Sequence, residues 1–236
     1  MKAWNLISLT EARRLAVEAL AAAPRQTEQV GLRQALGRIA ACDMINAEDN
    51  PAFDRSTVDG YAVRSQDLAA ASAATPVSLR LVGEVRMGRG YDGKISTGEA
   101  VRIPTGGMLP DGADAVLMQE YTAVGVAETV LAGRSVARRE NMVVRGDDVT
   151  AGTVVLAAGS KIGVPDLGVL ASCGFACVPV IKKPVVTVVT TGDEIIPPEA
   201  MPLPGQIRDV NSFTLAALAE LAGCEVIQAE RVADSQ

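Results

Sequence analysis

One long stretch of the sequence, from Asn50 to Asp148, shows short apolar runs separated by glycine-rich breaks and no long helical period. Short strands between turn residues are typical of all-β domains. We therefore predict an all-β domain, either a small barrel or a curled sheet, inserted at residues 50–148. The expected strands are Val77–Val85, Ala100–Ile103, Ala115–Gln119, Thr129–Leu131 and Met142–Val144.

The segments on either side of this stretch predict a small α/β domain that the β domain interrupts. Ser8 and Glu11 have the spacing of a capping box, which predicts an amphipathic helix that ends before Pro24. We also expect short helices near 32–36 and 166–172, and extended segments at 39–45 and 153–156. Residues 1–26 are assigned to an N-terminal helix that could pack on a third domain, and 27–49 with 149–181 to the small domain.

The third domain begins near Lys182. Val185–Val189 is a continuous β-branched run, typical of a parallel strand buried on both faces. Asn211 is expected to cap a helix reaching about Ala222, and Glu225–Glu230 to form the next strand. Residues 182–236 thus predict one β–loop–α–β unit, too small to complete an α/β domain. The predicted class is multidomain, α+β with α/β, in a chain that is a fragment or takes its partner strands from another molecule.

Composition restricts the chemistry. Histidine is absent, which excludes imidazole bases, Ser-His-Asp and Cys-His nucleophiles, and His-ligated metals. A net charge of −6 argues against a broad nucleic-acid-binding face. No apolar run approaches the ~20 residues of a membrane span, and the start lacks a secretory pattern. The four cysteines lack redox or zinc-finger spacing, so we expect reduced thiols and a cytoplasmic protein.

Three loop segments outside the third domain hold candidate functional residues. Ser56, Asp59 and Gly60 lie where a loop enters a strand, either as an anion-binding loop or as a solvated Asp-Gly turn. Thr105 and Gly106 begin a glycine pair that would let the backbone approach a ligand, or form a tight turn. Asp147, followed by a second aspartate, could hold Mg²⁺ or belong to a solvated turn.

The strongest candidate is the loop Thr191–Glu194, which follows the predicted parallel strand. Loops at the carboxyl ends of such strands line the binding crevice of open α/β sheets. Glu194 and Asp234, which ends the next expected strand, could together hold a divalent ion that bridges phosphates. A helix cap or a surface acid is the alternative. Neither G-x-G-x-x-G nor a P-loop is present, which disfavours a dinucleotide or P-loop enzyme.

These segments, in this order, closely resemble the molybdopterin molybdenumtransferase family (MoeA type, also the E domain of gephyrin). The resemblance covers nearly the whole chain but only the front part of the family's sequence. It implies a small domain, an inserted β domain, an α/β molybdopterin-binding domain and a C-terminal β domain. It also implies homodimers whose active sites are shared between subunits. The matching stretches are Pro51–Val63, Arg102–Glu120, Arg145–Gly152, Pro184–Glu194 and Gly205–Gly223.

The resemblance further implies that molybdate is inserted into adenylylated molybdopterin, with Mg²⁺ assistance and release of AMP. A molybdopterin adenylyltransferase would act upstream. The implied catalytic residues are Asp59, Thr105, Asp147, Glu194 and Asp234, of which Glu194 and Asp234 would bind Mg²⁺. The implied substrate-binding residues are Ser56, Gly60, Gly106, Gly192 and Asp193.

Lysine-bearing segments that follow in the family, suited to the pterin phosphate and the oxyanion, do not occur in this sequence. We therefore expect the isolated chain to lack part of its active site. One alternative is a non-catalytic dimerisation, scaffold or binding module derived from the family. Another is a molybdopterin adenylyltransferase, which the long segment ahead of Lys182 disfavours.

Overall fold

The computed structural model describes residues 7–21, 24–228 and 232. It separates into two compact units. Unit 1 comprises the segments 1–43 and 156–236, and unit 2 comprises residues 44–155. Within the described residues, no helix is both long and apolar enough to cross a membrane. All four cysteines are free thiols, in agreement with the expectation from their spacing.

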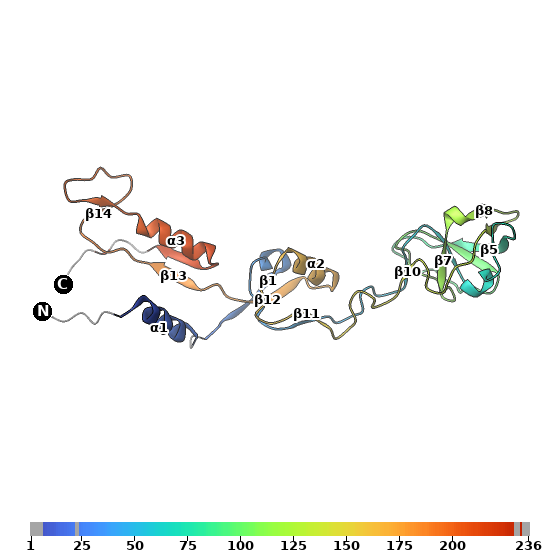
Figure 1. Ribbon diagram of the computed structural model, residues 1–236, viewed down its shortest axis with the longest axis horizontal. Coiled ribbons are helices and arrows are strands. Elements are labelled where there is room, and N and C mark those ends of the chain that lie inside the picture. The colour runs from blue at the N-terminus through green and yellow to red at the C-terminus, as the bar shows by residue number, and fades with distance from the viewer. Residues whose placement is uncertain (1–6, 22–23, 229–231, 233–236) are drawn as a thin grey trace. The chain divides into compact units, whose positions relative to one another are not determined.

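Unit 2 is built on a six-stranded mixed sheet with the strand order β7-β4-β6-β5-β9-β8 (Figure 1). Only β5 and β6 run parallel; the other neighbours are antiparallel. The expected strands are present, whereas β4 and β8 escape the sequence analysis because they are short and lie beside turn residues. The bounds are β4 Gly60–Val63, β5 Val77–Glu84, β6 Glu99–Ile103, β7 Ala115–Met118, β8 Thr122–Val124 and β9 Thr129–Ala132.

Two apolar clusters pack on opposite faces of this sheet. Successive side chains of a strand point to opposite faces, and on β4 Val63 joins one cluster while Ala62 joins the other. The first cluster also contains Leu79 and Leu117, both fully buried. The second contains Ile95 and Ile103. The buried members of both clusters are aliphatic, in a chain in which Phe, Trp and Tyr make up 3% of residues, and one partly buried tyrosine packs against each cluster, Tyr61 against the first and Tyr91 against the second.

Shorter elements complete unit 2. The two-residue strands β3 (Arg55–Ser56) and β10 (Met142–Val143) pair antiparallel, and β2 (Met44–Ile45) pairs with β11 (Val154–Leu156). Two 3-10 helices, η2 (Ser65–Leu68) and η3 (Gln119–Tyr121), follow β4 and β7. The β3–β10 pair lies next to the loop that carries Asp59.

In unit 1, β1 (Thr27–Gly31) pairs antiparallel with β12 (Cys177–Ile181). The 3-10 helix η1 (Leu32–Ala35) packs on both strands of this pair, and helix α2 (Val164–Ser172) packs on η1. The Gly163 amide donates to Asp166 Oδ2 at 2.8 Å, which satisfies a backbone group at the start of α2.

Helix α1 (Leu9–Ala21) begins as the capping pattern predicts, since Glu11 N donates to Ser8 Oγ at 3.1 Å. The Glu11 carboxylate pairs with Arg14. No described residue of α1 is buried, and its apolar face is largely exposed: Leu9 is 87% and Leu20 is 74% exposed.

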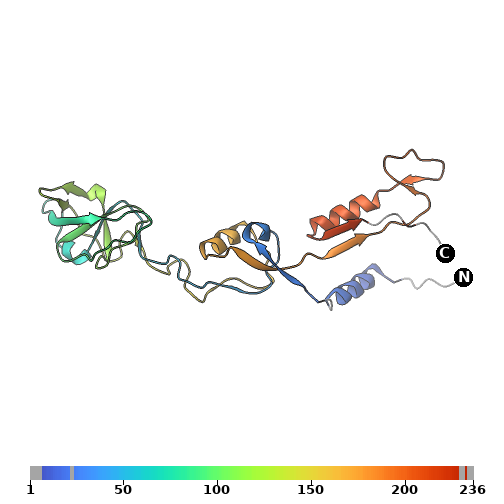
Figure 2. The same ribbon diagram turned by 180° about the vertical axis from the view of Figure 1, so that it is seen from behind.

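The predicted β–loop–α–β unit is present in unit 1. Strand β13 (Val185–Val188) runs parallel to β16 (Glu225–Gln228), and α3 (Asn211–Leu221) packs on both (Figures 1 and 2). Inside the connecting loop, β14 (Ile195–Ile196) and β15 (Ile207–Arg208) form a second parallel pair that the proline-rich sequence conceals.

Two details of this unit correct the sequence analysis. Burial of the first strand on both faces is wrong: Val185 is 58% and Val189 is 49% exposed. Among the described residues the strand has one partner strand and one helix, so most of its surface faces solvent. Asn211 does not cap α3 but is its first residue, and the carboxylate of Asp209 caps it instead.

Candidate functional site

The loop that enters β4 and the loop that leaves β6 meet at the Asp59 carboxylate. Gly60 lies opposite Ile103 in the antiparallel β4–β6 pair, which brings Asp59 next to the residues after Ile103. Asp59 Oδ1 accepts hydrogen bonds from Thr105 N at 2.7 Å and from Thr105 Oγ1 at 2.9 Å. Two residues predicted as catalytic from separate motifs are therefore in direct contact.

The electrostatics of this contact favour the carboxylate form. The hydrogen bond from the Thr105 backbone amide lowers the pKa of Asp59 most, followed by the bond from the Thr105 hydroxyl. Desolvation opposes these two effects to a smaller extent, and the positive charge of Arg102 makes the smallest contribution, lowering the pKa further. Both Thr105 groups donate hydrogen bonds to the carboxylate. Such donors stabilise the ionised form of the side chain over the protonated form.

Backbone contacts lock the same two loops together. Ser56 N donates to Gly107 O at 3.0 Å, and Gly106 N donates to Ser56 O at 2.8 Å. Gly106 has a φ of +79°, a conformation that side chains other than glycine rarely adopt. A Cβ atom on Gly60 would lie 2.1 Å from Leu117 O, so only glycine fits there. We call Ser56–Gly60 with Thr105–Gly107 the Asp59 loop pair.

Asp147 lies on a separate turn of unit 2. The turn is formed by Gly146, with φ +76°, and Asp147 N donates to Val144 O at 3.1 Å. The Asp147 side chain is exposed and makes no hydrogen bond or ion pair with a described residue. Its neighbour Asp148 lies 3.8 Å from Arg55 Nη2, measured from Oδ2. Within the described chain, no hydrogen bond or ion pair joins the Asp147 side chain to the Asp59 loop pair.

The remaining predicted residues lie in unit 1, in the loop after β13. Gly192 has a φ of +138°, and a Cβ built on it would lie 2.8 Å from Glu194 Oε2, so the Glu194 side chain folds back over the glycine. Asp193 and Glu194 are both exposed. Asp234 lies outside the described residues, and its predicted convergence with Glu194 stays a prediction.

A polar cluster at the carboxyl end of β13 was missed by the sequence analysis. Asp209 Oδ2 accepts hydrogen bonds from the hydroxyls of Ser212, at 2.5 Å, and Thr190, at 3.4 Å, and Thr190 is buried. Asp209 Oδ1 accepts from Ser212 N at 3.0 Å. Hydrogen bonds from Ser212, side chain first, lower the pKa of Asp209. An aspartate just ahead of an apolar helix was the available signal.

The described residues offer carboxylates of the kind that Mg²⁺ binds, but no complete protein site. Mg²⁺ is usually held by one or two carboxylates together with substrate phosphates and water. Glu194 is one exposed carboxylate of this kind. Within the described chain, no three His, Cys, Asp or Glu side chains gather closely enough to hold a metal ion.

Comparisons with known proteins identify relatives that match most of the chain. The family model for the MoeA N-terminal region (domain I and II) matches residues 7–174. A Staphylococcus aureus protein named molybdopterin molybdenumtransferase is 38% identical over 197 residues, covering 84% of this chain and 47% of that protein. A Haemophilus influenzae protein of the same name is 36% identical over 231 residues, covering 98% of this chain and 56% of that protein.

Solved structures give the same result. The MoeA molybdopterin biosynthesis protein from Pyrococcus horikoshii matches with a TM-score of 0.83 at 36% identity, covering 89% of this chain and 56% of that one. The chain therefore has a MoeA-like fold with a mixed sheet, and it spans about half the length of the relatives that it matches.

Proposed function

The chain belongs to the family of the MoeA N-terminal region (domain I and II), and we propose that it is the front part of a molybdopterin molybdenumtransferase. The complete protein would insert molybdate into adenylylated molybdopterin and release AMP, as a step of molybdenum cofactor biosynthesis in the cytoplasm. The observation that carries the proposal is the Asp59–Thr105 contact, because it joins two motifs that the family resemblance selects independently.

In this proposal the Asp59 loop pair binds and orients the substrate. Thr105 holds one oxygen of an ionised carboxylate with two donors, which leaves the second oxygen to accept a hydrogen bond from the substrate or a water molecule. A carboxylate fixed in this way needs little reorganisation when charge develops at the reacting centre. Ser56, Gly60 and Gly106 would keep the two loops close enough for this contact.

Unit 1 of one subunit would contribute the pyrophosphate end of the site, and unit 2 of the other subunit would contribute the Asp59 loop pair. Gly192 and Asp193 would contact the substrate, and Glu194 with Asp234 would hold Mg²⁺. The ion would supply neutralisation of the negative charge that develops on the pyrophosphate as AMP leaves. Asp147 would act beside the substrate from the turn at Gly146.

The proposed organisation follows the family. The segment 1–26, which includes helix α1, would precede a small domain formed by residues 27–49 and 149–181. A β domain fills residues 50–148 and the beginning of a molybdopterin-binding domain residues 182–236. We propose that the complete protein is a homodimer with active sites shared between subunits, supplied by a molybdopterin adenylyltransferase.

The test joins this chain to the part of the Haemophilus influenzae relative that follows the matched region, which we call the completed chain. AMP release is measured with adenylylated molybdopterin, with and without molybdate, and the intact relative serves as the positive control. We expect molybdate-dependent AMP release. A folded completed chain that releases no AMP, while residues 1–236 alone form a dimer, would instead support a dimerisation module without catalysis.

A further inference from the structure

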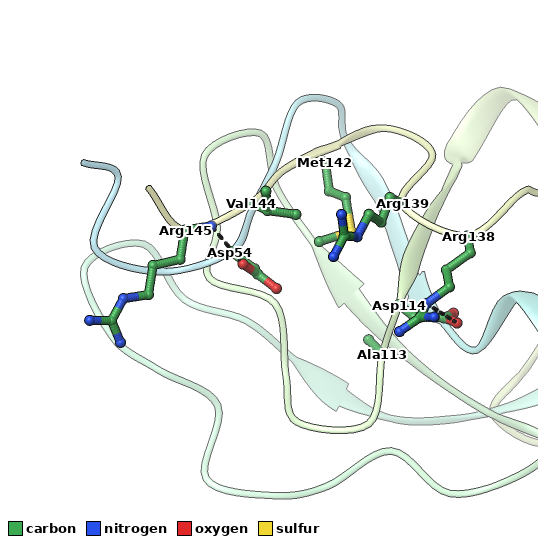
Figure 3. Close-up of a pocket in the computed structure, with 8 residues that line it drawn as sticks. All are labelled: Asp54, Ala113, Asp114, Arg138, Arg139, Met142, Val144 and Arg145. Atoms are coloured by element: carbon green, nitrogen blue, oxygen red, sulfur yellow. Dashed lines mark hydrogen bonds and ion pairs between the residues drawn. The ribbon is translucent and has the colours of Figure 1, made fainter. Parts of the chain in front are cut away.

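A basic loop of unit 2 borders a cavity, although the protein as a whole is acidic. The segment 133–145 contains four arginines and a single carboxylate, Glu140, whereas the chain has a net charge of −6. The cavity has a volume of about 310 Å³, and its lining includes Asp54, Arg138 and Arg139 (Figure 3). Concave sites lined by positive groups concentrate anions locally, whatever the net charge of the protein.

Two of the four arginines are already paired. The Arg134 guanidinium bonds to the Glu140 carboxylate and lies 4.7 Å from the centroid of the Tyr121 ring. Arg145 Nε lies 2.8 Å from Asp49 Oδ2. Figure 3 shows the Arg145 guanidinium pointing away from the other labelled side chains. Neither group has its charge directed into the cavity.

The other two arginines have unused donors at the cavity wall. Arg138 Nε is 3.9 Å from Asp114 Oδ2, but that carboxylate already accepts from Ser65 N at 2.6 Å and Ser65 Oγ at 3.0 Å. The Arg139 guanidinium makes no hydrogen bond or ion pair with any described residue. Its backbone is fixed at a φ of +65°, where its N–H donates to Asp114 O at 2.7 Å.

An acceptor completes the lining. Asp54 Oδ1 accepts from Arg145 N at 2.8 Å, and its carboxylate points toward the side on which Arg138 and Arg139 lie (Figure 3). The volume of the cavity is far above the ~10–15 Å³ that a cavity needs to hold one water molecule. It reaches the lower end of the ~300–1,000 Å³ range of small-molecule sites. The cavity therefore has room for an organic molecule beside an anionic group.

We propose that this cavity binds a phosphorylated small molecule. Arg138 and Arg139 hold its phosphate group, because a planar guanidinium donates two parallel hydrogen bonds to phosphate oxygens. Asp54 accepts a hydrogen bond from a hydroxyl or amino group of the organic part. The lining belongs to unit 2 alone, and binding requires no turnover, so the proposal stands or falls separately from the proposed function.

The experiment titrates the 236-residue chain with AMP, inorganic phosphate or molybdate at constant ionic strength, and follows the Nε–H resonances of the arginines by NMR. We expect AMP and phosphate to shift the Arg138 and Arg139 resonances, and AMP to bind more tightly than phosphate. Arg139→Ala should weaken AMP binding at least about tenfold, the effect of losing charge-assisted hydrogen bonds. Arg139→Lys should weaken it less, because the charge stays.

Two further variants sharpen the test. Arg89→Ala removes an exposed arginine of unit 2 outside the lining and should leave AMP affinity unchanged. Asp54→Asn keeps the acceptor for Arg145 N but removes a negative charge, so inorganic phosphate should bind more tightly and the preference for AMP should shrink.

The proposal is overturned if AMP and phosphate leave the Arg139 resonance unshifted, or if a folded Arg139→Ala variant binds them as tightly as the wild type does. Binding of molybdate alone would mean that the site takes a free oxyanion, and would also overturn it.

Discussion

At the scale of single residues, the Asp59 carboxylate depends on hydrogen bonds from Thr105. Thr105→Val removes the hydroxyl donor but keeps the backbone amide, which is the larger cause of the low pKa. We therefore expect the pKa of Asp59 to rise part of the way to its ordinary value, measured by NMR titration of the Asp59 carboxyl carbon. Thr105→Ser retains the hydroxyl and should leave the pKa low. Equal pKa values of Asp59 in the wild type and in Thr105→Val would refute a hydroxyl contribution.

The lowered pKa of Asp209 predicts that the stability of the folded protein depends on pH. Its pKa is lowered in the folded protein, so its contribution is present above the unfolded value of about 3.9 and is lost as pH falls through the folded value. Asp209→Asn should remove this acid-dependent loss. Two quantities are measured between neutral and strongly acid pH: the NMR chemical shift of the Ser212 amide, which donates to Asp209, and the melting temperature of the protein. An unchanged acid profile in the variant contradicts the assignment.

At this scale, the sequence selects candidate residues where their motifs are local. Asp59 and Thr105 are selected separately, 46 residues apart, and the β4–β6 pairing joins them. Thr190 is missed because a buried threonine at the end of a strand resembles its β-branched neighbours. Arg138 and Arg139 are missed because their cavity gathers residues from separate segments, and only the folded chain shows which arginines are already paired.

At the scale of secondary-structure elements, glycine is required in β4. Gly60→Ala would place a methyl group against Leu117 O on the adjacent strand, so we expect unit 2 to lose about 1–3 kcal/mol or more of unfolding free energy.

Gly168 lies inside α2, where a Cβ would meet nothing within 4 Å. Gly168→Ala should therefore stabilise the helix by about 0.5–1 kcal/mol. Thermal and denaturant unfolding measure both changes. Two effects of the same sign would contradict this account.

The strands of unit 2 show what a pattern can predict at this scale. The longer runs, such as β5, are evident because several apolar and β-branched residues follow one another. The two-residue strands β14 and β15 are concealed because their register depends on a pairing across a proline-rich loop. Burial of β13 is overpredicted because a β-branched run indicates a strand but does not indicate how many other strands and helices cover it.

At the scale of the whole molecule, unit 2 contains its own sheet and both of its apolar clusters. A fragment spanning residues 44–155 should therefore fold by itself, with an amide NMR spectrum that overlays the corresponding resonances of the full chain. A fragment with collapsed amide dispersion would show that unit 2 needs the rest of the chain to fold.

If the Asp59 loop pair belongs to the active site of a molybdenum-inserting transferase, loss of the Asp59 charge should stop the reaction. The most direct measurement is molybdate-dependent AMP release by the completed chain carrying Asp59→Asn, beside Asp92→Asn as a matched control on an exposed loop of the same unit. We predict that Asp59→Asn abolishes AMP release at an unchanged melting temperature, that Glu194→Ala does the same, and that Asp92→Asn retains full activity. Wild-type AMP release by the folded Asp59→Asn and Glu194→Ala variants would show that neither residue belongs to the active site.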